Sequence, residues 1–340
     1  MDESVVGADV DVRIIAALLA HPRARVGSLA AAAGTSAPTV SRRLAALQEQ
    51  RLVRVVGVLD QQRADAGFSV FLRLRCRTGT SVEVAHAVAR WPEAGYVSVI
   101  GGDLDCAAQL HLRSTAHLLE IMKGRLAGMR QVTGSSTSKI IRRFSTPHGW
   151  TGGLLGEQAL AALRAERLDH WSEDRPYRRS RLDATDEALL RELGDDGRRT
   201  WRHLADALGV QPATVSRRVE ALMSAGLLRL RTVVQPAVIG QPVVAYVWLR
   251  VAPSRLEAVG RALAAHPNVL NIAATTGHSN LSGEVAVASD EALYAFITED
   301  VGQLSGVAAV DVSDGLDVIK RGSLVFEPDS SGRIAEPTSG

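Results

Sequence analysis

The chain repeats itself at a fixed distance of 175 residues, and this repeat limits the folds that are open to it. The pentapeptide Thr-Val-Ser-Arg-Arg occupies residues 39–43 and recurs at residues 214–218. Without gaps, 13 of the 26 positions from 29 to 54 are identical to their counterparts at 204–229, far more than chance would give. The repeat indicates that the chain consists of two copies of one unit of about 140 residues. We place the two units near residues 5–144 and 180–325.

Each unit begins with three short helical patterns. In the first copy, Asp11 precedes apolar residues at helical spacing, residues 28–33 end at Gly34, and Ser36 opens a third helix that runs to about residue 50. Ser36 can cap this helix, and Pro38 lies in its first turn, where a missing N–H costs nothing. Two short helices joined through a glycine turn are typical of a helix-turn-helix. The second copy repeats the pattern, so we expect helix-turn-helix domains at 5–60 and 182–235.

One face of the third helix in each unit carries residues suited to a DNA groove. With Val40, Leu44 and Leu47 directed inward, Arg42 lies on the outer face and Arg43 at its edge. Arginine forks fit guanine edges and phosphates, and hydroxyl groups fit either partner. Because both copies keep the same pentapeptide while much of the surrounding surface differs, we predict a DNA-binding set on the two helices. Its members are Ser36, Thr39, Ser41, Arg42 and Arg43 in the first unit and Gln211, Thr214, Ser216, Arg217 and Arg218 in the second.

The rest of each unit alternates strand and helix patterns. A β-branched strand at 52–59, with its counterpart at 227–234, precedes six elements in the order βαββαβ. These elements fall at 69–76, 82–91, 96–100, 106–112, 116–126 and 137–144 in the first copy, and at 243–251, 255–265, 269–275, 283–288, 291–301 and 307–319 in the second. The order predicts an α+β fold in which a winged-type helix-turn-helix is followed by a ferredoxin-like domain.

This reading divides the chain into six segments. The ferredoxin-like domains are expected at 66–144 and 241–325, beside the helix-turn-helix domains given above. A linker at 145–181 joins the units, and the spacing of its leucines predicts a helix within 157–171. Residues 328–340 are rich in Ser, Gly and Pro, and we expect them to form a flexible tail.

The whole arrangement resembles the Lrp/AsnC family of feast/famine transcriptional regulators, over both units and about 285 residues. The resemblance is carried by Leu204-Ala205, by Gly209, by the pentapeptide at 214–218, by Gly226-Leu227-Leu228 and by the loop Ile-Gly-Gly-Asp-Leu-Asp at 100–105. It implies that the helix-turn-helix domains bind double-stranded DNA and that the ferredoxin-like domains assemble into dimers and higher homo-oligomers. It also implies a small effector, often an amino acid, which binds near the Gly-x-x-Asp loop.

The effector residues implied by the resemblance differ between the two copies. They are Gly101, Gly102, Asp103 and Asp105 in the first unit and Gly277 and Asn280 in the second. Glycines let backbone N–H groups approach a ligand carboxylate, and an aspartate can pair with an ammonium group. Asn280 lacks the charge that strengthens such a bond, so we expect the first loop to carry the working site. The open alternative is that the two aspartates only populate a tight hairpin turn.

Three features depart from the family pattern. Gln211 stands where the family commonly has a serine at the start of the recognition helix, and Arg51 stands where a glycine commonly follows it. A non-glycine residue in the left-handed conformation costs on the order of 1 kcal/mol. The usual chain of the family has one unit, so this chain is expected to act as its own pseudo-dimer. Because Ser36 and Gln211 differ, the two half-sites of one operator should be similar but not identical.

The composition excludes several other classes of protein. Two cysteines, Cys76 and Cys106, cannot build a disulfide framework or a four-ligand zinc site, so we expect buried reduced thiols. The Asp103-Leu104-Asp105 run lacks the glycine and glutamate of a calcium loop, and neither metal nor cofactor is expected. The sequence shows no signal peptide and no run of 18 uncharged apolar residues, which predicts a cytoplasmic protein without membrane contact.

Two alternatives to a transcriptional regulator stay open. Siroheme decarboxylases look similar to such regulators, share this fold and can occur as fused pairs. Where pocket histidines would be expected, this chain has Gln-Gln-Arg at 61–63 and Pro-Ala-Val at 236–238, and its recognition helices keep their arginines. The other alternative is a protein that senses amino acids without binding DNA. The prediction is a sequence-specific DNA-binding regulator that is not an enzyme.

Overall fold

The computed structural model describes residues 8–60, 67–167, 182–326 and 333–335. The chain forms two compact units, and each unit combines corresponding parts of both repeats. Among the described residues, unit 1 comprises 8–60, 148–167 and 182–239, and unit 2 comprises 67–147, 240–326 and 333–335. The two helix-turn-helix domains therefore share unit 1, and the two ferredoxin-like domains share unit 2.

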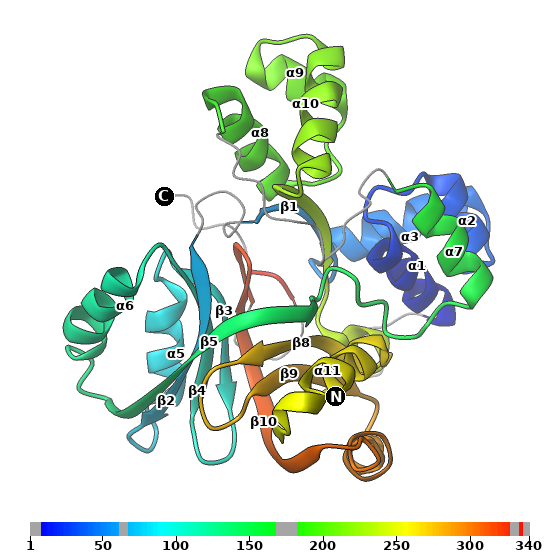
Figure 1. Ribbon diagram of the computed structural model, residues 1–340. Coiled ribbons are helices and arrows are strands. Elements are labelled where there is room, and N and C mark those ends of the chain that lie inside the picture. The colour runs from blue at the N-terminus through cyan, green and yellow to red at the C-terminus, as the bar shows by residue number, and fades with distance from the viewer. Residues whose placement is uncertain (1–7, 61–66, 168–181, 327–332, 336–340) are drawn as a thin grey trace. The chain divides into compact units, whose positions relative to one another are not determined.

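Unit 1 contains two copies of a three-helix domain, each followed by one strand (Figure 1). The first copy comprises α1 (Ala8–Ala20), α2 (Val26–Ala33), α3 (Ala37–Glu49) and β1 (Arg54–Leu59). The second copy comprises α8 (Ala184–Asp195), α9 (Trp201–Leu208), α10 (Pro212–Ser224), β6 (Leu228–Val233) and the 3-10 turn η2 (Pro236–Ile239). The helix α2 ends at Gly34 with φ 63°, and α9 ends at Gly209 with φ 66°, a conformation that glycine adopts without strain.

Apolar residues at the predicted helical spacing close each three-helix domain. Val40, Leu44 and Leu47 of α3 are buried, as are Val215, Val219 and Leu222 of α10. The second set packs with Leu189 and Leu193 of α8 and Leu204 of α9 in one apolar cluster. The period of the sequence pattern therefore identified the inner face of each recognition helix correctly.

The strands of unit 1 join the two repeats. Strand β1 pairs antiparallel with β6, from Arg54 opposite Val233 to Leu59 opposite Leu228. This differs from the predicted winged type, because among the described residues each repeat supplies one strand and no hairpin. The strand pattern alone could not reveal this, since a single β-branched strand does not say which strand it pairs with.

The same contact occurs twice across unit 1, as expected of a two-fold pair. Arg23 and Arg198 occupy equivalent positions, and each donates two hydrogen bonds to backbone carbonyls of the loop that carries the other. The acceptors are Gly197 and Arg199 at 2.8 and 2.9 Å, and Pro22 and Ala24 at 2.6 and 3.0 Å. Such a reciprocal exchange is the signature of an isologous interface, here formed within one chain.

The linker contributes a helix to unit 1. Helix α7 (Glu157–Ala165) falls inside the predicted range and packs against α1 and α2 of the first copy. Its Leu163 is buried, and Arg167 just beyond it donates a hydrogen bond to the carbonyl of Ala20 at 2.9 Å. This packing makes the two sides of unit 1 unequal, because the chain has a single linker.

Unit 2 contains the βαββαβ order twice, as predicted. The first copy comprises β2 (Phe68–Cys76), α5 (Ser81–Ala89), β3 (Ala94–Ile100), β4 (Cys106–Leu112), α6 (Thr115–Ile121), the π-helical turn η1 (Met122–Leu126) and β5 (Val132–Ser145). The second comprises β7 (Val243–Val251), the turn η3 (Pro253–Arg255), α11 (Leu256–Ala265), β8 (Val269–Thr275), β9 (Leu281–Val287), α12 (Asp290–Ala295), the π-helical turn η4 (Phe296–Val301), β10 (Val307–Arg321) and β11 (Leu324–Val325). Strand β5 begins earlier than the predicted 137.

The last strand of each copy crosses into the sheet of the other copy. The nine strands of unit 2 follow the order β11-β10-β3-β4-β2-β5-β8-β9-β7, so the first copy contributes a sheet β3-β4-β2-β5 and the second a sheet β8-β9-β7-β10. The end of β5 pairs with β8, where Ile140 lies opposite Thr275, and the end of β10 pairs with β3, where Gly315 lies opposite Ile100. Since β10 also pairs with β7, the strand pairings form a closed circuit through both copies.

Each sheet buries one face under its own helices. Val84 and Val88 of α5 pack on the first sheet, and Val259 and Leu263 of α11 pack on the second. A separate apolar cluster contains Ile100 and Ala107 of the first copy with Tyr246 and Trp248 of the second. The two repeats of unit 2 are therefore joined through side chains as well as through crossed strands.

Candidate functional site

The two recognition helices begin differently. Ser36 accepts a hydrogen bond from the backbone N–H of Thr39 at 3.3 Å, so it caps α3 as predicted. Gln211 occupies the equivalent position of α10 and makes no side-chain cap. Its side chain is exposed and can therefore reach outward. The difference that the sequence predicted at the start of the two helices is present in the structure.

The first arginine of each pentapeptide is exposed. Arg42 lies on α3 and Arg217 on α10, and among the described residues neither has an ion-pair partner. Thr39 and Thr214 are half-buried one turn before them. Ser41 is exposed, whereas Ser216 is half-buried and donates a hydrogen bond to Glu220 at 3.0 Å. The helices thus present one unpaired cation each at the position that the sequence pattern indicated.

The second arginine of each pentapeptide has a different environment. Arg43 forms an ion pair with Asp11 of α1 at 3.6 Å. Arg218 donates to Asp183 at 2.7 Å and to Asp186 of α8 at 2.9 Å. Asp186 lies 175 residues after Asp11, so the same link between first and third helix is built in both repeats. In the structure these arginines link the recognition helix to its own domain, and their predicted contact with DNA stays a prediction.

The turn after each recognition helix takes the left-handed conformation. Arg51 has φ 58° and Gly226, its counterpart, has φ 70°. The sequence comparison predicted this strain, because a glycine commonly stands at the position of Arg51. The first repeat therefore carries a local cost on the order of 1 kcal/mol that the second repeat avoids.

The predicted effector loop of the first repeat, in unit 2, lies against the last strand of the second repeat. The N–H of Gly101 donates to the carbonyl of Asp314 at 2.8 Å. Gly102 has φ 113°, and a Cβ added there would lie 3.4 Å from the hydroxyl of Ser313. Gly277 has φ 106° and faces Ser138 in the same way. Both loops are thus built from both repeats of unit 2.

The acidic residues of the first loop differ in their surroundings. Asp103 is exposed, and its backbone carbonyl accepts a hydrogen bond from Arg75 at 3.1 Å. Asp105 is half-buried and accepts a hydrogen bond from the backbone N–H of Cys76 at 2.7 Å. One oxygen of Asp105 therefore holds the end of strand β2, a structural role that the sequence reasoning kept open.

Asn280 performs the same structural task in the second repeat. Its amide oxygen accepts from the N–H of Val251 at 2.8 Å, and its amide nitrogen donates to the carbonyl of Val251 at 2.7 Å. Val251 is the counterpart of Cys76. Asn280 thus makes the same contact to the strand end without a negative charge. The structural role of this position therefore does not require the charge that Asp105 carries.

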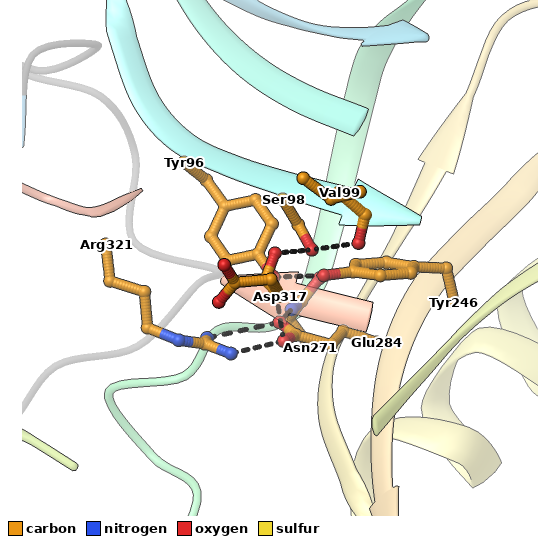
Figure 2. Close-up of polar contacts among 8 residues, drawn as sticks. All are labelled: Tyr96, Ser98, Val99, Tyr246, Asn271, Glu284, Asp317 and Arg321. Atoms are coloured by element: carbon orange, nitrogen blue, oxygen red, sulfur yellow. Dashed lines mark hydrogen bonds and ion pairs between the residues drawn. The ribbon is translucent and has the colours of Figure 1, made fainter. Parts of the chain in front are cut away.

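A buried polar cluster joins the two repeats of unit 2, and sequence reasoning did not find it (Figure 2). Arg321 forms an ion pair with Glu284, and the hydroxyl groups of Tyr96 and Tyr246 contact each other. Glu284 also accepts hydrogen bonds from Tyr96 at 3.2 Å and from Asn271 at 3.0 Å. Arg321 and Glu284 are each 3% exposed, so the ion pair is removed from water.

The opposite charges of Arg321 and Glu284 stabilise each other in this cluster. Burial by itself lowers the pKa of Arg321, but the Glu284 carboxylate outweighs it, so the pKa is raised and the guanidinium stays charged. Burial raises the pKa of Tyr246, and the Glu284 carboxylate raises it further. The tyrosines therefore stay neutral donors beside a fixed ion pair.

The first repeat has different residues at the positions equivalent to this cluster. The positions equivalent to Glu284, Arg321 and Tyr246 are Gln109, Thr146 and Phe71 in the first repeat. Arg73 and Trp248 also occupy equivalent positions, and the Arg73 guanidinium lies 4.4 Å from the centre of the Trp248 ring. A comparison of the two copies, searching for charges present in only one, would have been the signal for this cluster.

The structure also bears on the thiols, on metal binding and on membrane-spanning helices. Both cysteines are free thiols, but only Cys106 is buried as expected, whereas Cys76 is half-buried. Burial raises the pKa of Cys76 to about 11. Within the described ranges, no group of His, Cys, Asp or Glu side chains is arranged to hold a metal ion. No described helix combines the length and the apolar character that crossing a bilayer requires. The residues at 61–63, which bear on the decarboxylase alternative, lie outside the described part of the chain.

Family models match all four domains. The AsnC-type helix-turn-helix domain matches residues 9–48 and 182–223. The Lrp/AsnC ligand binding domain matches residues 69–148 and 244–325. Together these matches cover well over half of the chain.

Curated relatives match one repeat at a time. An uncharacterized HTH-type transcriptional regulator of Pyrococcus horikoshii is 29% identical over 137 residues, which are 40% of this chain and 87% of the relative. The HTH-type transcriptional regulator Ptr1 of Methanocaldococcus jannaschii is 28% identical over 143 residues, 42% of this chain and 97% of the relative. Each relative corresponds in length to a single repeat.

A solved structure matches both repeats together. The siroheme decarboxylase NirDL has a TM-score of 0.59 and 14% sequence identity, and the match covers 95% of this chain and 96% of the other. At this identity the likeness concerns the fold alone.

Proposed function

Because the chain belongs to the Lrp/AsnC family of DNA-binding regulators that respond to an effector, we propose that it is a one-chain pseudo-dimer reading two half-sites of one operator. The observation that carries this proposal is the reciprocal contact of Arg23 and Arg198, which pairs the two helix-turn-helix domains within unit 1. Two readers on one backbone bind their half-sites at a high effective concentration. Each presents one unpaired arginine, Arg42 or Arg217.

Identification of the operator sequence tests this proposal. In vitro selection with the full chain should enrich a pseudo-palindrome with half-sites about one helical turn apart. The half-sites should differ at the bases that face the helix starts, because the exposed Ser36 is engaged in capping its helix and the exposed Gln211 is not. Footprinting on the selected DNA would measure both the spacing and the protected length. Protection of a single half-site would contradict the pseudo-dimer.

We also propose that the loop at Gly101–Asp105 carries the effector site, with an amino acid as the ligand class. Gly102 and Asp103 supply backbone N–H groups, Asp103 also supplies an exposed carboxylate, and Asp105 adds a second charge, while the N–H of Gly101 is used to hold the loop to Asp314. The second loop, with Gly277 and Asn280, has no carboxylate at the position of Asp105. The first loop can therefore meet both the carboxylate and the ammonium group of an amino acid.

The variant Asp105→Asn separates charge from structure. It should keep the hydrogen bond to Cys76, because Asn280 already makes the equivalent bond to Val251. Loss of the charge-assisted bond should raise the Kd for an amino acid about tenfold or more, measured by calorimetry. The matched control Asn280→Asp leaves the first loop intact and should not weaken this binding. Unchanged affinity in Asp105→Asn would contradict the assignment.

We further propose that chains associate into a homo-oligomer through unit 2. Large apolar side chains are exposed at equivalent positions of both repeats, Leu119 with Tyr294 and Ile141 with Leu316. Exposed apolar groups repeated by a pseudo-two-fold can meet those of another copy. Light scattering at micromolar concentration should show more than one chain per particle. The double variant Ile141→Lys/Leu316→Lys should reduce the number of chains per particle. A strict monomer would contradict the proposal.

An enzymatic function has less support. The named curated relatives are transcriptional regulators, and the likeness to the siroheme decarboxylase concerns the fold alone. The turn at 236–238 supplies no histidine, and the recognition helices keep their exposed arginines. We therefore do not propose decarboxylation for this chain.

A further inference from the structure

A cavity of about 630 Å³ is lined by residues of unit 1. Its walls come from three parts of the chain: the turn between α1 and α2, the end of the linker helix α7, and the second helix-turn-helix domain. Its size is in the range of sites that bind small molecules. No step of the proposed DNA reading uses it.

Part of the cavity lining is apolar and aromatic. Met223 and Leu230 of the second repeat line it and are buried. Trp201 also lines it, and the guanidinium of Arg23 lies 3.8 Å from the centre of the Trp201 ring. Arg23 is already engaged, since it donates to two backbone carbonyls of the second repeat. Arg23 and Trp201 therefore form a fixed wall that can cover an apolar group.

Besides Arg23, two charged residues of opposite sign line the cavity, Arg25 and Glu166. Arg25 is exposed, and in the described part of the chain no carboxylate pairs with it. Glu166, at the end of α7, accepts a hydrogen bond from the hydroxyl of Ser28 and has no cationic partner among the described residues. The Ser28 contact holds the carboxylate of a lining residue in place. A cation and an anion beside apolar lining residues match a zwitterion with an apolar side chain.

We propose that this cavity binds a free amino acid with an apolar side chain, independently of the effector loop in unit 2. The ligand carboxylate pairs with Arg25, its ammonium group pairs with Glu166, and its side chain lies against Trp201, Met223 and Leu230. The equivalent positions of the other repeat do not reproduce this site. The linker helix supplies Glu166, and the positions equivalent to Arg25 and Trp201 are Thr200 and Val26. A ligand held by both repeats also opposes their separation.

Calorimetry with L-leucine and L-phenylalanine on the full chain tests the proposal. The variant Asp105→Asn serves as the background, so that the loop in unit 2 does not contribute. One saturable site per chain is expected, and Arg25→Gln and Glu166→Gln should each raise the Kd about tenfold or more. Leucinamide and N-acetyl-leucine, which each lack one charge, should bind correspondingly more weakly. Two matched controls, Arg202→Gln and Glu157→Gln, change exposed charges that do not line the cavity and should leave the Kd unchanged.

Fluorescence locates the ligand. Binding should change the tryptophan emission of the chain, and Trp201→Phe should remove this change while calorimetry still detects binding. Failure to saturate at about 10 mM, or a Kd indifferent to both Arg25→Gln and Glu166→Gln, would overturn the proposal. Neither result would bear on the operator experiment, which is carried out without amino acids.

Discussion

The double variant Arg42→Ala/Arg217→Ala is expected to lose most of its affinity for the selected operator. An arginine that contacts a base edge through two hydrogen bonds contributes roughly 1–3 kcal/mol to binding. The two residues lie on different helices and share no partner, so their effects should add to about 2–6 kcal/mol. Gel shifts at several salt concentrations would measure the loss. If the arginines contact only phosphates, the loss should be uniform over DNA sequences, and the salt dependence should decrease by about two charges.

Two control variants make this loss interpretable. Arg90→Ala/Arg113→Ala removes the same total charge from exposed positions of unit 2 and should leave the operator affinity nearly unchanged. Arg43→Ala/Arg218→Ala removes the arginines that pair with Asp11 and Asp186. This pair should weaken binding indirectly, with a measurable loss of thermal stability that the variants of Arg42 and Arg217 do not show. Equal affinity of Arg42→Ala/Arg217→Ala and the wild-type chain would exclude DNA reading by these residues.

The variant Glu284→Gln is expected to destabilise unit 2 by about 3–5 kcal/mol, because it leaves the charge of Arg321 buried without its partner. Glutamine is the residue at the equivalent position of the first repeat, Gln109, so the side chain itself fits a strand of this kind. Urea unfolding followed by tryptophan fluorescence would measure the change, since Trp248 stacks on Tyr246 of the cluster.

The double variant Glu284→Gln/Arg321→Thr tests the cause of this effect. It removes both charges and gives the second repeat the residues of the first, Gln109 and Thr146. Replacing a whole buried ion pair is far less costly than breaking it, so a large part of the stability should return. A double variant that is less stable than Glu284→Gln alone would show that shape, and not the unpaired charge, controls the stability of this cluster.

The sequence predicted the helices and strands well, but it did not predict which strands pair with each other. The helical period identified Val40, Leu44 and Leu47 as core residues, and the glycines at 34 and 209 marked the helix ends. These features depend on local geometry, which neighbouring residues determine. The pairing of β1 with β6 and the crossing of β5 and β10 depend on contacts far apart in the chain. No local pattern encodes which distant edge a strand will join, so the exchange between repeats could not be derived.

In the candidate site, too, local positions could be predicted from the sequence but contacts between distant elements could not. The outward position of Arg42 and Arg217 followed from the helical period, whereas the partners of Arg43 and Arg218 did not, since Asp11 and Asp186 belong to another helix. The asymmetry of the effector loops could be predicted because Asp105 and Asn280 align directly. The structural bond of Asp105 to Cys76 could not, because it crosses from a loop to a strand end.

The crossed strands of unit 2 have a consequence for the synthesis of the chain. Strand β3 is complete at Ile100, but the part of β10 that pairs with it begins only at Gly315. At 5–20 residues per second, a ribosome needs roughly 10–40 s to make the intervening chain. During this time the first ferredoxin-like repeat exposes a sheet edge that can pair with another nascent chain. Slowed translation over the second half of the message should therefore increase co-translational aggregation, and it should do so more than for a single-unit relative.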